Sequence, residues 1–259
     1  MLDIAESAAR QLSDRDARTP GTMFAEHFSL SEDEAYAIQA EVCRLREQRG
    51  ESVVGYKIGC TSTSIQQQLH IDHPVFGRLF DSERWPTGTS LESSQFCGLA
   101  IEGELAVRLS RDLSADELTD ADVLAAIESV FPIIELHHLV FRRSERTAEE
   151  LIANNAIHAG FVFPANSSVE FDIEPATLRI DINDEPVATV SGTELTRTVV
   201  DSIRWLSREL HSHGRGLLTG QTILCGSVAD LFPISSKCRI VVTTDRFGSV
   251  ECTIDEETG

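Results

Sequence analysis

Apolar side chains in the first part of the chain recur at the spacing of amphipathic helices. One weak apolar stripe consists of Leu2, Ile4, Ala8 and Leu12. A second helix is expected to begin after Ser31, because a serine followed three residues later by Glu34 is typical of a capping box, and to end at Gly50. The pattern therefore predicts an N-terminal helical segment over residues 1–52.

From residue 52 onward, short runs rich in β-branched and aromatic residues predict strands, and residues 99–109 alternate with a period of two. The other expected strands cover residues 52–60, 76–80, 131–141, 178–182, 187–190, 222–227, 238–244 and 249–254. The expected helices cover residues 120–130, with a capping box at Thr119 and Asp122, and residues 147–157 and 199–214. This pattern predicts one β-rich α+β domain over residues 53–259.

The chain is strongly acidic. Its 259 residues include 22 Lys and Arg against 42 Asp and Glu, which gives a formal net charge of −20. Such a chain repels phosphate groups, so neither nucleic acid nor an anionic membrane surface is an expected partner. No apolar run reaches the roughly 18 residues of a membrane span, and the N-terminus lacks the pattern of a signal peptide. We therefore expect a cytoplasmic protein with reduced cysteines.

Three carboxylates are the strongest candidates for chemistry. The alternation in residues 99–109 puts Glu102 and Glu104 on one strand face, although a solvated face is the commoner explanation for such a pair. Glu135 lies in an apolar run, where a buried carboxylate needs a cation or several hydrogen-bond donors. Together they predict an oxygen-rich site for Mg²⁺ or Mn²⁺, whereas no spacing of Cys or His supports zinc.

Lysine is rare in this sequence: of the 22 basic residues, only Lys57 and Lys237 are lysines. Lys57 lies in an apolar run between Gly55 and Gly59. A lysine at a strand edge often extends its amine to solvent, but its rarity here favours a catalytic role. Burial and a neighbouring cation are then expected to lower its pKa. The sequence His70-Ile-Asp72-His73 is a weaker alternative for a metal site.

Five segments occur in an informative order: GYKIGCTSTSIQQQLHIDHPVFGRLF, IEGELAVRLSRDL, FPIIEL, LIANNAIHAGFVF and LLTGQTILCGS. Together they resemble the 2-keto-4-pentenoate hydratase and 4-oxalocrotonate decarboxylase family, within the fumarylacetoacetate hydrolase fold. The resemblance implies a mixed β-roll or sandwich with appended helices, and a homo-oligomer built as a ring of five or its dimer. It also implies that Glu102, Glu104 and Glu135 hold Mg²⁺ and that Lys57 acts near the substrate enolate.

The function implied is addition of water to a 2-hydroxy-2,4-dienoate, giving a 4-hydroxy-2-oxo acid through a metal-stabilised enolate. Two alternatives remain open: decarboxylation of a 2-oxo diacid or hydrolysis of an acylpyruvate, and a catalytically inactive partner subunit. The expected contacts to this small 2-oxo acid are Gln68, Val75, Phe76, Glu150, Asn155 and Ser227. The sequence departs from the family pattern at Leu139-Val140, at Asn154 and at Val75, where relatives carry a Ser-Arg pair and acids. His158, four residues after Asn154, is expected on the same helical face.

Overall fold

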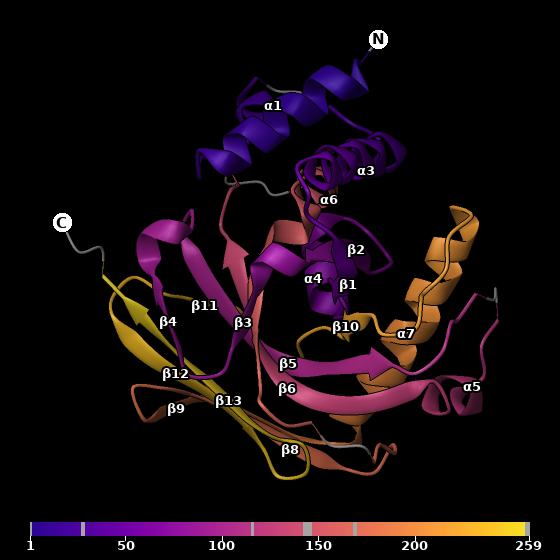
Figure 1. Ribbon diagram of the computed structural model, residues 1–259, viewed down its shortest axis with the longest axis vertical. Coiled ribbons are helices and arrows are strands. Elements are labelled where there is room, and N and C mark those ends of the chain that lie inside the picture. The colour runs from indigo at the N-terminus through magenta and orange to yellow at the C-terminus, as the bar shows by residue number, and fades with distance from the viewer. Residues whose placement is uncertain (1, 27–28, 115–116, 142–146, 168–169, 257–259) are drawn as a thin grey trace.

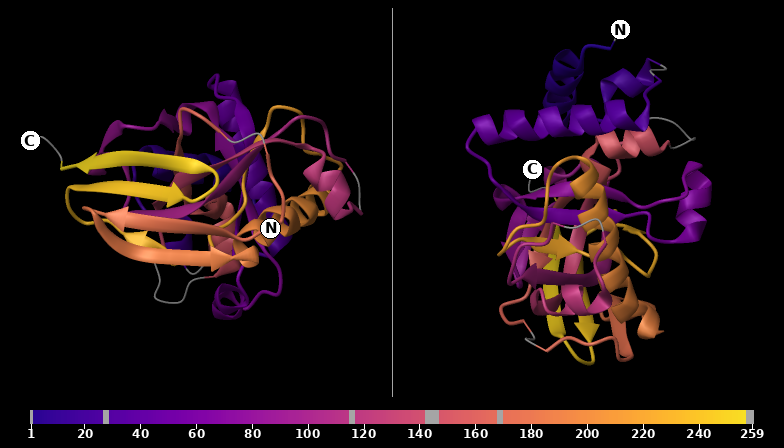
Figure 2. Two further views of the ribbon diagram at one scale, coloured as in Figure 1. Left: turned by 90° about the horizontal axis from the view of Figure 1, so that it is seen from below. Right: turned by 90° about the vertical axis from the view of Figure 1, so that its right-hand side faces the viewer.

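The computed structural model describes residues 2–26, 29–114, 117–141, 147–167 and 170–256. Three helices come first: α1 (Ile4–Asp16), α2 (Thr22–Ala25) and α3 (Glu32–Gln48). The capping box at Ser31 is present, with Glu34 as the partner residue. These helices lie together at one end of the molecule, above the strands in Figure 1 and in the right view of Figure 2.

Two sheets make up the rest of the fold. The larger has the order β2-β1-β10-β5-β6-β7-β3, with β11 paired to β5. Its strands are β1 (Val53–Gly59), β2 (Val75–Phe80), β3 (Arg84–Pro86), β5 (Leu99–Leu109), β6 (Ile127–His138), β7 (His158–Phe163), β10 (Thr222–Leu224) and β11 (Phe232–Pro233). The smaller sheet, of order β4-β13-β12-β8-β9, consists of β4 (Thr89–Glu92), β8 (Ala176–Ile182), β9 (Glu185–Gly192), β12 (Cys238–Thr244) and β13 (Gly248–Asp255).

The two sheets pack face to face below the helices (Figure 1). The sheets approach each other closely at Gly103 of β5, because a Cβ there would come within 2.8 Å of Ile180 and 2.9 Å of Val242. The remaining helices are α4 (Thr63–Leu69), α5 (Asp120–Leu124), α6 (Ala148–Ala153) and α7 (Thr193–Ser212), with short 3₁₀ turns η1 (Asp81–Glu83), η2 (Ser93–Gln95) and η3 (Asn155–Ile157). The apolar face of α7 is buried, as its pattern predicts. No described helix is long and apolar enough to span a membrane.

Two helix predictions are wrong at their C-terminal ends. The helix expected over residues 120–130 ends at Leu124, because the following residues pair with β5, for example Val130 with Val107. The helix expected to reach residue 157 ends at Ala153, and His158 instead begins β7.

The second helix ends early because of a contact between residues that are distant in the sequence. The Asn155 side chain binds the backbone of Arg78 in β2, accepting from its N–H at 2.7 Å and donating to its carbonyl at 2.8 Å. Gly77 lies so close that a Cβ there would be 2.5 Å from the Asn155 carbonyl oxygen. Asn155, Ala156 and Ile157 all have positive φ, so the backbone turns out of the helix and His158 shares no helical face with Asn154.

Candidate active site

Two neighbouring strands bring the predicted acids to one face of the larger sheet. In the antiparallel pairing of β5 with β6, Glu102 lies directly opposite Glu135. Glu104 follows Glu102 by two residues and His137 follows Glu135 by two residues, so all four side chains share that face. Both faces of β5 are largely covered, and Glu104 is fully buried. The solvated strand face considered from the sequence is therefore wrong for Glu104.

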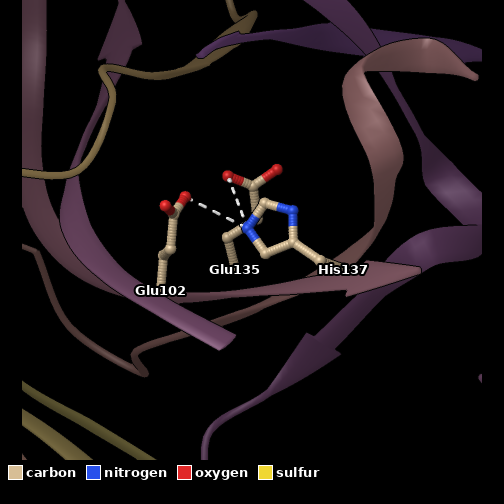
Figure 3. Close-up of side chains that lie close together, drawn as sticks. All are labelled: Glu102, Glu135 and His137. Carbon is tan, nitrogen blue, oxygen red and sulfur yellow. Dashed lines mark hydrogen bonds and ion pairs between the residues drawn. The ribbon is translucent and has the colours of Figure 1, made fainter. Parts of the chain in front are cut away.

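Glu102, Glu135 and His137 converge most closely. One possible ligand atom from each lies within 4.8 Å of the others. His137 Nε2 is 3.1 Å from Glu102 Oε2 and 3.6 Å from Glu135 Oε2. Dashed lines mark these two contacts in Figure 3. His137 and Glu135 are buried and Glu102 is half-buried. A pair of acids with an imidazole between them can bind a divalent cation.

Glu104 lies beside this group, and its surroundings disfavour its ionised form. One of its carboxylate oxygens accepts a hydrogen bond from the Gly226 N–H. Burial and then the negative charge of Glu135 raise the pKa of Glu104 well above its usual value. Its ionised form therefore requires further positive charge nearby.

Lys57 supplies one such charge. Its side chain is buried, and Nζ lies 3.3 Å from Glu135 Oε1. Burial alone would lower the pKa of Lys57, but the carboxylates of Glu135, Glu102 and Glu104 outweigh it, so the pKa is raised. The lowered pKa expected from the sequence depends on burial together with a bound cation, whereas in the chain alone the carboxylates around the amine outweigh its burial.

His158 holds the other side of Glu135. Its Nδ1 lies 2.7 Å from Glu135 Oε1, and its side chain is fully buried. Burial alone would raise the pKa of Glu135, but Lys57, His137 and His158 hold it well below its usual value. Sequence reasoning missed the contacts of both histidines with Glu135. His137 lies two residues after Glu135, so the strand periodicity could have revealed it, whereas His158 depends on the pairing of β6 with β7.

The centre also contains buried polar atoms that lack a hydrogen-bond partner. Among the described residues these include Glu104 Oε1, Glu135 Oε2, His137 Nδ1 and His158 Nε2. Buried carboxylate oxygens without a partner are costly, and here three acids face one lysine and two histidines. The donor set therefore fits a divalent cation that prefers oxygen ligands.

A pocket of about 930 Å³ opens beside the centre, a volume suited to a small ligand. Lys57, Glu102 and His137 line it, together with Gln68 and Ser227 from the expected substrate contacts. Its apolar lining includes Leu139, Phe141, Leu151, Ile157 and Leu231.

The other four expected substrate contacts do not line this pocket. Val75 and Phe76 are buried in hydrophobic clusters, and Glu150 is buried in α6. Asn155 binds the backbone of β2, as described above. In the weaker metal alternative, His70 lines the pocket, but His73 Nε2 instead lies 3.2 Å from Glu32 on the N-terminal helix α3.

The architecture and the acid centre together define an α+β protein of the fumarylacetoacetate hydrolase fold. Residues 74–255 match the family described as fumarylacetoacetate (FAA) hydrolase C-terminal. The chain belongs to this family, which confirms the resemblance noted in the sequence.

Relatives support the same assignment. The chain is 31% identical over 239 residues to 2-hydroxyhexa-2,4-dienoate hydratase of Comamonas testosteroni, covering 91% of this chain and 90% of the relative. It is 30% identical over 207 residues to 2-keto-4-pentenoate hydratase of Paraburkholderia xenovorans, covering 79% and 77%.

Among solved structures, 4-oxalocrotonate decarboxylase from Pseudomonas putida G7, complexed with magnesium and adipate, matches with a TM-score of 0.91 at 23% identity, covering 98% of this chain and 99% of that chain. Fumarylpyruvate hydrolase from Pseudomonas aeruginosa, in complex with Mn²⁺ and pyruvate, matches with a TM-score of 0.63 at 13% identity, covering 78% and 89%. These likenesses confirm the predicted mixed fold with its N-terminal helices.

Proposed function

We propose that this chain is a metal-dependent hydro-lyase. It adds water to a 2-hydroxy-2,4-dienoate of the 2-keto-4-pentenoate type and yields a 4-hydroxy-2-oxo acid. The observation that carries this proposal is the buried centre of acids, with unpartnered carboxylate oxygens, beside a pocket of about 930 Å³. The names of relatives about 30% identical over most of the chain agree with it.

In this proposal Glu102, Glu104 and Glu135 hold one Mg²⁺ or Mn²⁺. Each side chain offers carboxylate oxygens, which are the ligands that these hard ions prefer. The bound ion would act as a Lewis acid on the 2-oxo group of the substrate. The partnerless oxygens of Glu104 and Glu135 support this ligand set, because burying them without a cation is costly.

Lys57 is the proposed catalytic residue. Its ion pair with Glu135 favours the ammonium form, which can donate a proton to the substrate or stabilise negative charge on an enolate oxygen. The same ion pair holds Nζ beside the Glu135 carboxylate, and Lys57 lines the wall of the pocket. Lys57 can therefore reach a substrate bound in that pocket.

The pocket walls suit the two ends of such a substrate. The amide of Gln68 and the hydroxyl of Ser227 are proposed to bind its polar atoms, since both residues line the pocket. Leu139, Leu151 and Ile157 can contact an apolar tail and exclude water from it.

We also propose that the chain works in the cytoplasm as a homo-oligomer, a ring of five or its dimer. Sedimentation would measure this oligomeric state.

A product screen tests the proposed reaction. The purified protein with Mg²⁺ is incubated separately with a 2-hydroxy-2,4-dienoate, an unsaturated 2-oxo diacid and an acylpyruvate, and products are identified by mass spectrometry. Formation of a 4-hydroxy-2-oxo acid supports the hydratase. Release of CO₂ would identify a decarboxylase, and two acid products would identify a hydrolase. Tight metal binding without turnover of any substrate would instead indicate an inactive partner subunit.

A further inference from the structure

We infer that His137 is a nitrogen ligand of the proposed metal centre and that it shifts the preference of the centre from Mg²⁺ toward first-row transition ions such as Mn²⁺ and Co²⁺. This inference rests on the proposed function, because it concerns the same ion. The three glutamates alone would form an all-oxygen site. An imidazole within the same ligand set changes the chemistry of that site.

The position of His137 is fixed by the sheet. It lies on β6 two residues after Glu135, and the pairing of β6 with β5 puts it on the face that carries Glu102. Its side chain is 2% exposed, so it has little room to turn away from the carboxylates. In Figure 3, dashed lines join Nε2 of the ring to one oxygen of each of the two carboxylate groups.

The separations fit ligands that share an ion. Two ligand atoms bonded to one ion at about 2.1 Å, at right angles to each other, lie about 3.0 Å apart. His137 Nε2 lies 3.1 Å from Glu102 Oε2 and 3.6 Å from Glu135 Oε2. The longer of these is too long for a hydrogen bond, and Glu135 Oε2 has no hydrogen-bond partner among the residues that the structure describes. An ion bound between His137 Nε2 and Glu135 Oε2 would be a partner for both atoms.

The nitrogen ligand determines the expected selectivity. Mg²⁺ binds carboxylate and water oxygens and gains little from an imidazole, whereas affinity at a site with nitrogen rises from Mn²⁺ to Co²⁺. The centre should therefore bind Co²⁺ most tightly of these three ions and Mg²⁺ most weakly. Mn²⁺, which accepts oxygen and nitrogen ligands alike, should lie between them.

Calorimetric titration of the purified protein with Mg²⁺, Mn²⁺ and Co²⁺ measures this selectivity. In His137→Gln, the affinities for Mn²⁺ and Co²⁺ are expected to fall by at least about tenfold relative to that for Mg²⁺. His138→Gln is the matched control, because His138 follows on the same strand but its Nδ1 accepts from the Cys97 N–H at 3.1 Å. This control should leave the ratio of affinities unchanged.

Pulsed electron paramagnetic resonance of the Mn²⁺-loaded wild-type protein gives a second, independent measurement. A directly bound imidazole nitrogen should couple to the Mn²⁺ spin, and the coupling should vanish in His137→Gln. If that variant does not fold, the wild-type spectrum alone decides.

Three results would overturn the inference, and they separate it from the proposed function. An unchanged affinity ratio without nitrogen coupling would mean that His137 is not a ligand, while the glutamate site stands. Tighter binding of all three ions to His137→Gln would mean that His137 is not a ligand. Its ring would then compete with the ion by donating a hydrogen bond to a carboxylate. Failure of the wild-type protein to bind any of the ions would overturn the proposed metal site together with the inference.

Discussion

Two clusters of buried and half-buried charged residues, both within the part of the chain that the structure describes, differ in how their charges balance. The acid centre, formed by Glu102, Glu104, Glu135 and Lys57, holds three carboxylates and one ammonium. The second cluster, which we call the junction cluster, joins α1 and α3 to the larger sheet. It consists of Arg15, Arg46, Glu51 and Glu83.

The junction cluster has two cations for two acids. Arg46 Nε lies 3.0 Å from Glu51 Oε1, and Arg46 Nη2 lies 3.0 Å from Glu83 Oε1. Its guanidinium also stacks 3.5 Å above the ring of Phe80, and Arg15 pairs with Glu83.

The contrast separates a structural role from a functional one. Glu83 Oε2 also lacks a hydrogen-bond partner, but both acids of the junction cluster have cationic partners within the chain, so the balance of charge there can be explained by folding alone. The acid centre has more negative charge than its lysine can offset, and it lies on a pocket. An excess of buried charge that the chain does not neutralise indicates a bound ion or substrate.

The largest effect is expected from Lys57→Met. Turnover should fall by about 10²–10⁴-fold, because the variant loses a proton donor. Methionine keeps the apolar stem, but the free energy of unfolding should also fall, because the three acids lose their ammonium partner. Steady-state kinetics and circular dichroism measure the two effects. Lys237→Met is the matched control, since that exposed lysine pairs with Asp255 far from the pocket. A folded Lys57→Met variant with unchanged kcat would eliminate the catalytic role.

Glu51→Gln should test the junction cluster. Losing a charge-assisted hydrogen bond to Arg46 is expected to lower the free energy of unfolding by about 1–2 kcal/mol without changing metal affinity. Urea unfolding measures this loss, and Glu47→Gln on the exposed side of α3 is the control.

The pH dependence of Glu51→Gln follows from the pKa of Glu51. Burial alone would raise that pKa, but the hydrogen bonds from Arg46 and Ser82 lower it below its unfolded value of 4.5. Its stabilisation is therefore present above pH 4.5 and lost as the pH falls through the folded pKa. Acidification should destabilise the wild type more than the variant, and equal losses would show that Glu51 is not the stabilising group.

Glu104→Gln should change the free energy of unfolding in the opposite direction to Glu51→Gln. Removing a buried negative charge from the excess should raise the free energy of unfolding, measured in EDTA at pH 7, by about 1 kcal/mol, because the amide oxygen can still accept from Gly226 N–H. Since the pKa of Glu104 is raised, its cost grows as the pH rises above 4.5, so the gain should shrink at lower pH. The same variant should lose affinity for Mg²⁺. A destabilisation like that of Glu51→Gln would remove the contrast between the two clusters.

The smallest effect concerns the apolar wall of the pocket. Each methylene added to the substrate tail should raise kcat/KM about fourfold, or about 0.8 kcal/mol, where it contacts residues such as Leu151 and Ile157. Kinetics along a series of dienoates with increasing tail length measures this. A flat or falling series would instead indicate a polar or carboxylate-tailed substrate.

The sequence predicted the parts of the fold that local pattern determines. The capping box at Ser31, the alternating strand over residues 99–109 and the amphipathic helix ending near residue 214 are all present. The errors came from contacts between distant segments. Pairing with β5 converts residues 127–130 to strand, and the bond of Asn155 to β2 ends α6 early.

The acid centre was predictable only in part for the same reason. The period of two placed Glu102 and Glu104 together, and the apolar run marked Glu135, but the register between β5 and β6 was needed to bring them to one face. His158 reaches Glu135 through β7, a pairing that no local pattern indicates. The raised pKa of Lys57 likewise depends on how many acids the fold gathers around it.

The central claim, that the excess of acids holds a divalent ion, is tested most directly by anomalous scattering from crystals grown with Mn²⁺. We predict one anomalous peak within bonding distance of carboxylate oxygens from Glu102, Glu104 and Glu135. Crystals in which these three carboxylates diverge, or in which Mn²⁺ binds elsewhere and leaves them without a peak, would contradict the claim.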